Sequence, residues 1–441
     1  MKRIYEPLAY SEDVRRNCYW STTIAPLEQP QLKGAHQTDV AIIGGGFTGL
    51  NAALHLAKDG VDVMLLDAET IGWGASGRNG GFCCLGGGVL DNKQIDKIHG
   101  QDARREWRTA EVDAIAHVAA LLKRHQIDAD THSKGETLLA HKAKRIATLE
   151  QHAQDAAESY GVEPTLIPQK ELAHHGLSGP FHGAVTIPIG FGLNPMKYAL
   201  GLANAARQAG AALFERSPVQ RIEQNGGFTL HTPNGTLTAK RLIIATNGYS
   251  SEDVPDWLAA RFMPMQSSVL VTRPLSDAEL AAAGWTSDQM AYDSRTLLHY
   301  FRLMPDRRFL FGMRGGLFAT PRSEAKIKTL IRTHFEKMFP AWAHVDTPHM
   351  WSGLVCMNAK GAPFTGPIPE MPSAFASLSY HGNGVAMASY CGALLADLVQ
   401  DKATSLPYPE ILKKPPPKFP FGSKRRWILQ PLLGTMALLD R

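Results

Sequence analysis

The residues whose types and spacing indicate chemistry stand near the start of the chain. Gly44, Gly46 and Gly49 form a GxGxxG pattern, and the acidic Asp67 follows 18 residues after the last glycine. In a strand–turn–helix unit, the first glycine permits the turn and the second lets the backbone approach a pyrophosphate. The third lets the helix pack closely on the strand, and the acid can bind ribose hydroxyls. The pattern therefore predicts dinucleotide binding.

The elements around these glycines are those that such a site requires. Residues 40–43 are a short apolar, β-branched run, which is typical of a buried parallel strand. Apolar residues then recur at helical spacing from residue 50 to residue 57, and Gly60 suits the end of a helix. A second strand is expected over residues 61–66, directly before Asp67.

The next stretch, IGWGASGRNGGFCC over residues 71–84, has neither a helical nor a strand period. Its small residues would let the backbone lie against a large flat ligand. Ser76, Arg78 and Asn79 offer donors to phosphate or to ring heteroatoms. A mobile surface loop is the alternative. A nicotinamide dehydrogenase of the doubly wound kind would usually pass from its second strand into another helix, so a flavin is favoured here.

Two later segments also favour a flavin. Residues 241–250, RLIIATNGYS, predict a buried strand that runs into a turn of small residues. Residues 379–400 contain the turn Gly382-Asn383-Gly384 and then a long apolar helical pattern. The positive end of such a helix would face the turn. It would stabilise the negative N1/O2 edge of a reduced flavin.

Together these segments resemble the D-amino-acid oxidase superfamily of FAD-dependent oxidoreductases, and within it most of all the γ-glutamylputrescine oxidase group. The likeness runs from about residue 18 to residue 405. It rests on Tyr19-Trp20, IIGGGFTGLNAALHLAKDG, IGWGASGRNGG, IIATNGY, HYFRLMPDRRFLFGMRGG, WSGLVCMNAKGAPFTGPIP and YHGNGVAMA.

The resemblance implies FAD as the cofactor and positions for the residues that bind it. The glycines of the first turn would cradle the pyrophosphate, Asp67 would bind the adenosine ribose, and Val219 would meet the adenine through its backbone. The set of expected cofactor residues is Gly44, Gly46, Phe47, Thr48, Gly49, Asp67, Ser76, Arg78, Asn79, Gly80, Val219, Thr246, Asn247, Gly382, Asn383 and Gly384. Replacing Arg78 by alanine is expected to weaken FAD retention without unfolding the chain.

Departures from relatives favour non-covalent FAD and an unusual substrate. The flavin-linking cysteine of sarcosine oxidases would fall near Gly353, and Cys356 misses that position by about one helical turn. A linking histidine would fall near Arg78-Asn79, which cannot serve. The carboxylate-binding lysine and arginine of amino-acid-oxidising relatives correspond to Ala386 and to the Val355-Cys356 region. We therefore expect an amine whose acidic end, if any, lies far from the reacting carbon.

The expected fold is α/β, with a Rossmann-like FAD-binding domain interleaved with an α+β substrate domain built on an antiparallel sheet. Residues 1–92, 183–255 and 348–405 would build the FAD-binding domain. Residues 93–182 and 256–347 would build the substrate domain. Residues 406–441 form a Pro-rich and then basic, amphipathic tail. Packing of this tail on the protein's own surface or on a second subunit is favoured over contact with a membrane.

The reaction that the resemblance implies is oxidation of a C–N bond in γ-glutamylputrescine or a related polyamine, as in putrescine breakdown. Hydride transfer to flavin N5 would give an imine and then an aldehyde, with O2 or another electron acceptor reoxidising the cofactor. No catalytic residue is assigned. The substrate-pocket candidates are Tyr300, Arg302, His299, Trp351 and His381, and Arg302 could pair with a distant carboxylate.

Two other functions remain open at this point. One is a D-amino-acid or secondary-amine (sarcosine-like) dehydrogenase, which passes electrons to a carrier. The other is a non-catalytic flavoprotein partner whose FAD is structural.

Composition excludes several further classes. The net charge of +5, from 46 basic and 41 acidic residues, comes without a dense basic stripe, so we expect no nucleic-acid partner. The five cysteines form no CxxC pattern and no metal site is expected, which favours a reducing compartment. No apolar run is long enough for a transmembrane helix, and a cytoplasmic location is the default expectation.

Overall fold

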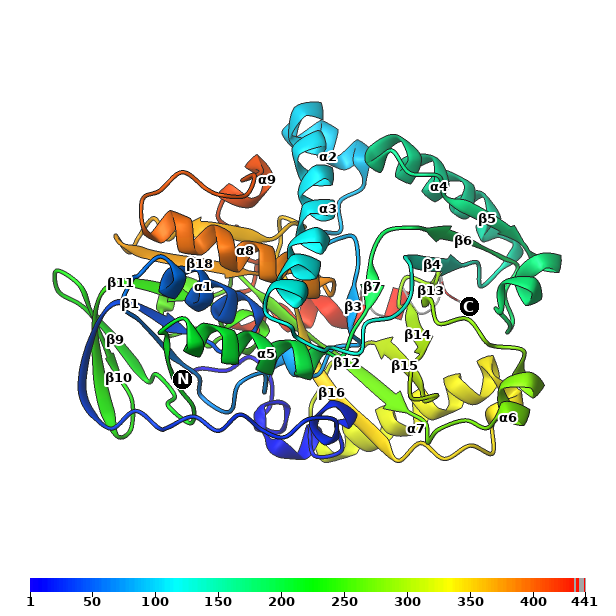
Figure 1. The fold of residues 1–441 in the computed structure, drawn as a ribbon, viewed down its shortest axis with the longest axis horizontal. Coiled ribbons are helices and arrows are strands. Elements are labelled where there is room, and N and C mark those ends of the chain that lie inside the picture. The colour runs from blue at the N-terminus through cyan, green and yellow to red at the C-terminus, as the bar shows by residue number, and fades with distance from the viewer. Residues whose placement is uncertain (432–433, 436–439, 441) are drawn as a thin grey trace.

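The computed structural model describes residues 1–431, 434–435 and 440, and within them the chain folds around two large sheets (Figure 1). The first sheet has the order β17-β18-β11-β1-β2-β8, with the β9–β10 hairpin added at β11. The core strands from β18 to β8 are parallel. Its strands are β1 (Gly34–Ile43), β2 (Val63–Leu66), β8 (Ala212–Phe214), β9 (Arg221–Gln224), β10 (Phe228–His231), β11 (Gly235–Ile244), β17 (Phe364–Pro367) and β18 (Ala374–Leu378).

Helices cover the first sheet in the manner of a doubly wound fold. The helices α1 (Phe47–Lys58), α5 (Pro195–Gln208) and α8 (Gly384–Val399) lie together over one face (Figure 1). The second half of β1 and most of α8 are buried. Both elements carry apolar residues on every side that contacts a neighbouring strand or helix. The predicted strand, helix and second strand around the GxGxxG turn are thus confirmed.

The second sheet has the order β16-β12-β15-β14-β13-β4-β6-β5. All of its pairs are antiparallel except β13 with β4. Its strands are β4 (Glu136–Leu139), β5 (Thr165–Pro168), β6 (Gly183–Ile187), β12 (Met263–Val271), β13 (Met290–Asp293), β14 (His299–Leu303), β15 (Phe309–Arg314) and β16 (His349–Met357). The small sheet of β3 (Phe82–Cys83) and β7 (Phe191–Gly192) completes the set.

The two faces of the second sheet meet different surroundings. On one face, α7 (Pro321–Met338) and the short α6 (Asp277–Ala283) enclose an aromatic core around Trp285, Phe301 and Phe309. The other face turns toward α4 (Ile146–Tyr160) and the first sheet. The helices α2 (Asn92–His99) and α3 (Gln101–Arg124) stand between the two halves (Figure 1). The expected α/β class is confirmed.

The expected domain boundaries at residues 183 and 348 fall at the starts of β6 and β16. Both strands pair inside the second sheet and so lie with the substrate half of the molecule rather than with the nucleotide half. The reason is hydrogen bonding: β16 runs beside β12 over nine consecutive residue pairs before the chain crosses to β17. The composition of β16 does not reveal which sheet it joins.

The described part of the tail packs on the protein's own surface. The short helix α9 (Glu410–Lys413) contacts β17. In the 3₁₀ turn Gly422–Ile428, Arg425 is buried and donates to the carbonyl of Phe262, and Arg426 stacks 3.8 Å from the Tyr5 ring. Residues 432–433, 436–439 and 441 of the predicted amphipathic segment lie outside the described residues. Among the helices that are described, none is both long and apolar enough to cross a membrane.

Candidate active site

The turn between β1 and α1 is shaped by its glycines. Gly44 has a φ of +111°, and a Cβ there would lie 2.7 Å from the carbonyl oxygen of Ala245. A Cβ on Gly49 would lie 1.9 Å from the carbonyl oxygen of Gly44, so only glycine lets the helix approach the strand. Gly46 caps α1 without a side-chain hydrogen bond. The amide of Phe47, the first residue of α1, donates to the Ser76 hydroxyl, and the amides of the next residues in the first turn have no side-chain cap and can meet a phosphate in front of the turn.

Asp67 follows β2 and is held by backbone donors. Its Oδ2 accepts a hydrogen bond of 2.6 Å from the amide of Gly45, and its Oδ1 accepts one of 2.8 Å from the amide of Glu69. Burial raises the pKa of this carboxyl. The carboxyl sits at the rim of the glycine turn, where an acid can receive ribose hydroxyls. These features fit a dinucleotide.

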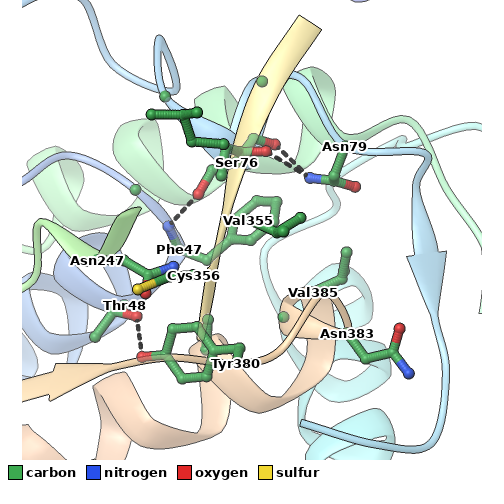
Figure 2. A pocket seen from close by; sticks show the side chains of 18 of the residues that line it. Phe47, Thr48, Ser76, Asn79, Asn247, Val355, Cys356, Tyr380, Asn383 and Val385 are labelled. Atoms are coloured by element: carbon green, nitrogen blue, oxygen red, sulfur yellow. Dashed lines mark hydrogen bonds between the residues drawn. The ribbon is translucent and has the colours of Figure 1, made fainter. Parts of the chain in front are cut away.

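One cavity of about 540 Å³ runs from this turn to the second sheet. Figure 2 shows part of it, with Phe47 and Ser76 on one side, Asn247 and Cys356 beside them, and Tyr380, Asn383 and Val385 opposite. Sixteen of the sequence-predicted residues line it: Gly44, Gly46, Phe47, Thr48, Asp67, Ser76, Arg78, Asn79, Gly80, Val219, Thr246, Asn247, Tyr300, Gly382, Asn383 and Gly384. Gly49 lies behind the lining, where it packs α1 on the turn.

The glycine-rich segment 71–84 is fixed in place and is no mobile surface loop. The hydroxyl of Ser76 accepts from the amide of Phe47 at 2.9 Å, and the Asn79 amide donates to two carbonyls of its own turn (Figure 2). Two buried indoles hold the outer edge. Trp351 donates to the carbonyl of Arg78 at 2.8 Å, and Trp20 donates to the carbonyl of Asn79 at 2.9 Å.

Arg78 is almost fully buried and has one nitrogen to spare. Its Nε donates to the Trp73 carbonyl at 2.7 Å, its Nη1 donates to the Ser352 carbonyl at 3.2 Å, and its guanidinium lies 3.9 Å from the Trp73 ring centre. Its Nη2 has no hydrogen-bond partner among the described residues. A cofactor acceptor atom would satisfy this donor. The expectation that Arg78→Ala spares the fold is revised, because the substitution would also leave two buried carbonyls unpaired.

The other end of the cofactor region is the start of α8. Asn383 precedes this helix without capping it through its side chain, which instead donates to the carbonyl of Leu85 at 3.2 Å. Gly382 has a φ of +98°, a conformation that favours glycine. Gly384 and Val385 line the cavity, and the start of α8 has no side-chain cap. Figure 2 shows Val385 at this end of the cavity. The positive helix end thus points into the cavity, as predicted.

The second sheet supplies the floor of the cavity beyond these turns. Tyr292, Tyr300, Gly312 and Val269 are directly opposite one another on four neighbouring strands. The Tyr300 ring lies across β15 because Gly312 has no side chain; a Cβ there would lie 2.1 Å from the ring. The Tyr300 hydroxyl is 3.1 Å from the hydroxyl of Ser267, and burial raises its pKa, so the phenol stays protonated.

Arg314 is a cavity-lining candidate that the sequence analysis did not predict. It lies two residues after Gly312 on the same face of β15, lines the cavity, and approaches Gly382 at the start of α8. Within the described part of the chain, its guanidinium makes neither an ion pair nor a hydrogen bond, and burial lowers its pKa. Side chains alternate between the two faces of a strand, so the sequence FLFGMR places Arg314 on the same face as Gly312. This alternation is the sequence signal that could have identified Arg314.

Arg302, the favoured candidate for binding a carboxylate, lies outside the cavity lining. It points to the same face as Tyr300, but the chain around β7 covers it. Its Nη2 donates to the Leu193 carbonyl at 2.7 Å and its Nη1 donates to Nε2 of His132 at 2.9 Å. Burial lowers the pKa of Arg302 to about 9 and the pKa of His132 to about 4. Through these two hydrogen bonds, Arg302 holds Leu193 and His132 in place.

Arg302→Met is expected to lower the melting temperature by roughly 2–6 °C, because the buried Leu193 carbonyl loses its donor. The KM for an amine substrate should change less than about two-fold, because the side chain does not reach the cavity. Thermal unfolding and steady-state kinetics of the two purified chains measure both quantities. A large rise in KM without a change in melting temperature would contradict this assignment.

The other three pocket candidates also lie outside the lining. His299 faces away from the cavity, with Nδ1 2.7 Å from Asp293 and Nε2 2.7 Å from His334. Trp351 donates to the carbonyl of Arg78 and so holds the Arg78 loop, residues 71–84, in place. His381 is buried, and burial lowers its pKa to about 4, so its ring is neutral. Of the five candidates, the structure brings only Tyr300 to the cavity.

A charged lobe at the far end of the cavity was not predicted. It is lined by residues of α3, α4, β4 and β13, including Arg108, Glu111, Glu136, Tyr160 and Tyr292. Arg108 pairs with Glu111 at 2.7 Å, and the Tyr160 hydroxyl donates to the same carboxylate at 2.8 Å. These residues come from distant helical and strand segments, so no local sequence pattern joins them. No group of three or more metal-ligating side chains occurs in the described residues.

Comparison with known proteins places this site among flavoenzymes. Residues 39–398 match the sequence model of the DAO family, described as FAD dependent oxidoreductase. The chain is 35% identical to a probable oxidoreductase OrdL of Rhizobium meliloti, over 93% of this chain and 94% of that protein. It is 32% identical to the gamma-glutamylputrescine oxidoreductase of Escherichia coli, over 83% and 84%. Glycine oxidase from Geobacillus kaustophilus has the same fold, with a TM-score of 0.68, 22% identity, and coverage of 84% and 96%.

Proposed function

The chain belongs to the DAO family of FAD-dependent oxidoreductases, which act on C–N bonds, and we propose that its substrate is γ-glutamylputrescine or a closely related acylated polyamine. One observation carries the proposal. A single cavity joins the nucleotide-binding turn to a floor where Tyr300 stands beside Arg314, whose guanidinium pairs with none of the described residues. An amine with an anionic group remote from its reacting carbon suits this floor.

Different groups of residues would bind different parts of the cofactor. The uncapped start of α1 and Asp67 would hold the pyrophosphate and ribose, and the spare Nη2 of Arg78 would meet an acceptor on the ring system. The start of α8 would face the pyrimidine edge. Bound FAD supplies the two-electron acceptor for the amine. The proposal includes non-covalent FAD, because burial raises the pKa of Cys356 to about 12 and keeps its thiol protonated.

The substrate residues act by orientation and by excluding water. Tyr300, with its neutral phenol, forms one wall, and Val269 and Val355 add apolar surface. Such surroundings disfavour the ammonium form of a reacting amine, so the neutral amine can form without a dedicated base. Arg314 would bind the remote carboxylate of the γ-glutamyl group. It thereby takes the role that the sequence suggested for Arg302.

A test is anaerobic mixing of the purified holoenzyme with a panel of γ-glutamylputrescine, putrescine, sarcosine and D-alanine. We expect γ-glutamylputrescine to bleach the flavin absorbance near 450 nm at least ten-fold faster than the other three. Oxygen uptake and peroxide release then distinguish an oxidase from an enzyme that uses another acceptor. Faster bleaching by sarcosine or D-alanine would overturn the substrate assignment. Bleaching by no amine at all would favour a non-catalytic flavoprotein.

A further inference from the structure

We propose that Glu136 binds a second, non-reacting ammonium group of the substrate, so that the enzyme selects amines with a positive charge remote from the oxidised carbon. This inference rests on the proposed function for the identity of the reaction. It assigns the restriction of the substrate class to one residue, Glu136, in the charged lobe at the far end of the cavity.

The backbone places Glu136 at the cavity edge of the second sheet. Gly135, with a φ of +111°, leads into β4, and a Cβ there would lie 2.1 Å from the Ile187 carbonyl oxygen. Glu136 is therefore the first residue of the strand, opposite Met290 of β13. Its side chain is 5% exposed, and it lines the cavity on the same face as Tyr292.

The Glu136 carboxyl lacks the partners that its neighbour possesses. Among the described residues, the Tyr292 hydroxyl donates to its Oε1 at 3.4 Å, and the Cys84 thiol is a close neighbour. In contrast, Glu111 has both Arg108 at 2.7 Å and Tyr160 at 2.8 Å. Among the described residues, no lysine, arginine or histidine forms an ion pair with Glu136. A buried carboxylate is costly unless a cation joins it.

Electrostatics of the lobe make Glu136 responsive to such a cation. Burial, together with the charge of Glu111 on α3, raises the pKa of Glu136 to about 7, while hydrogen bonds from Cys84 and Tyr292 oppose the rise. A bound ammonium would favour the carboxylate form. The carboxyl is charged above its pKa, so affinity for a cation should increase as pH rises through about 7 and fall below it. The other titratable groups that face this cluster are Arg108, Tyr160 and His152.

Glu136 and Arg314 line one cavity and are complementary when both are ionised, and neither forms an ion pair with another described residue. Both lie within electrostatic range of Cys84 and of Tyr292, which are common neighbours of the two. A group that carries an ammonium and a carboxylate side by side could engage both residues. The α-amino-acid head of a γ-glutamyl amide has this composition, and a simple alkylamine does not.

The test compares γ-glutamylputrescine with glutarylputrescine, which keeps the remote carboxylate and lacks the ammonium. Glu136→Gln should raise the apparent Kd for flavin reduction by γ-glutamylputrescine ~10- to 100-fold, as loss of a charged hydrogen bond predicts. The limiting rate should stay within about three-fold, and glutarylputrescine should be unaffected. Glu136→Asp should restore part of the affinity. Glu150→Gln on the exposed face of α4 is the matched control.

A pH series from 6 to 8 adds an independent readout. In the unsubstituted chain, affinity for γ-glutamylputrescine should rise with pH by more than affinity for glutarylputrescine, and Glu136→Gln should remove that difference. Equal loss on both substrates, or loss on neither, would overturn the inference. FAD content and melting temperature identify a variant that is merely misfolded, and Glu136→Asp then decides the question.

Failure of the proposed function would look different. If no amine reduces the flavin, calorimetry of the oxidised holoenzyme with putrescine and with n-butylamine still tests Glu136 directly. Putrescine should bind at least about ten-fold more tightly, and Glu136→Gln should abolish that preference. Absence of a preference in the unsubstituted chain would refute the role of Glu136 independently of any reaction.

Discussion

A Gly49→Val chain is expected to be purified without FAD. The new Cβ would lie 1.9 Å from the carbonyl oxygen of Gly44, a clash that no backbone adjustment of a fraction of an ångström can relieve. Helix α1 must move away from β1, and the amides of its first turn then leave the pyrophosphate position. A misplacement of about 1 Å in such donors can cost roughly 100-fold, and overpacking adds about 1–3 kcal/mol of instability.

The measurement is the ratio of absorbance at 450 and 280 nm after purification, followed by FAD titration of the apoprotein. Gly226→Asn in the β9–β10 hairpin is the matched control. Its glycine has a φ of +67° and open space around it, and asparagine tolerates that conformation. The control should retain stoichiometric FAD. Stoichiometric FAD in Gly49→Val would show that the helix-to-turn contact is not needed for cofactor binding.

The second large effect concerns substrate recognition. Arg314→Met should reduce kcat/KM for γ-glutamylputrescine by ~100-fold, because a buried charge-assisted bond to the remote carboxylate is lost. The loss should be less than about three-fold with 4-aminobutanoylputrescine, which keeps the ammonium and lacks the carboxylate. Methionine approximates the volume of the arginine stem, so the floor of the cavity stays filled.

Arg302→Met provides the comparison within the same sheet. It removes a guanidinium that hydrogen-bonds to Leu193 and His132 and does not line the cavity. It should not discriminate between the two substrates. If Arg314→Met impairs both substrates equally while FAD content is normal, Arg314 serves the reaction itself and does not recognise the carboxylate. If FAD content also falls, Arg314 serves the cofactor.

The nucleotide half of this protein was predictable because its determinants are local. The glycine turn, the acid after the second strand and the turn before α8 each lie within one short segment, and each segment has a fixed relation to its own strand or helix. The family resemblance added the order in which these segments meet the cofactor. Accordingly, every predicted cofactor residue lines the cavity or, as with Gly49, packs directly behind it.

The substrate half was less predictable because its residues meet through sheet register. Tyr300 and Arg302 lie on the same face of β14, so the sequence pattern does not distinguish them. Tyr300 lines the cavity, whereas Leu193 and His132 cover Arg302. Arg314 lies on the same face of β15 as Gly312, where the Tyr300 ring packs, and both Arg314 and Tyr300 line the cavity. The charged lobe depends on α3, β4 and β13 converging, which no periodicity in any one of them indicates.

The position of β16 has a consequence for how this enzyme could acquire new substrates. Through Trp351 and Ser352 this strand holds the Arg78 loop, and through residues 353–356 it lines the same cavity. Mutations on β16 are therefore expected to weaken cofactor binding as well as to change substrate specificity. Tyr292 lies on β13 and Glu136 lies on β4, three and four strands further along the sheet than β12, respectively. Natural variation or laboratory evolution of substrate range should accumulate on those two strands, while β16 stays nearly constant among active descendants.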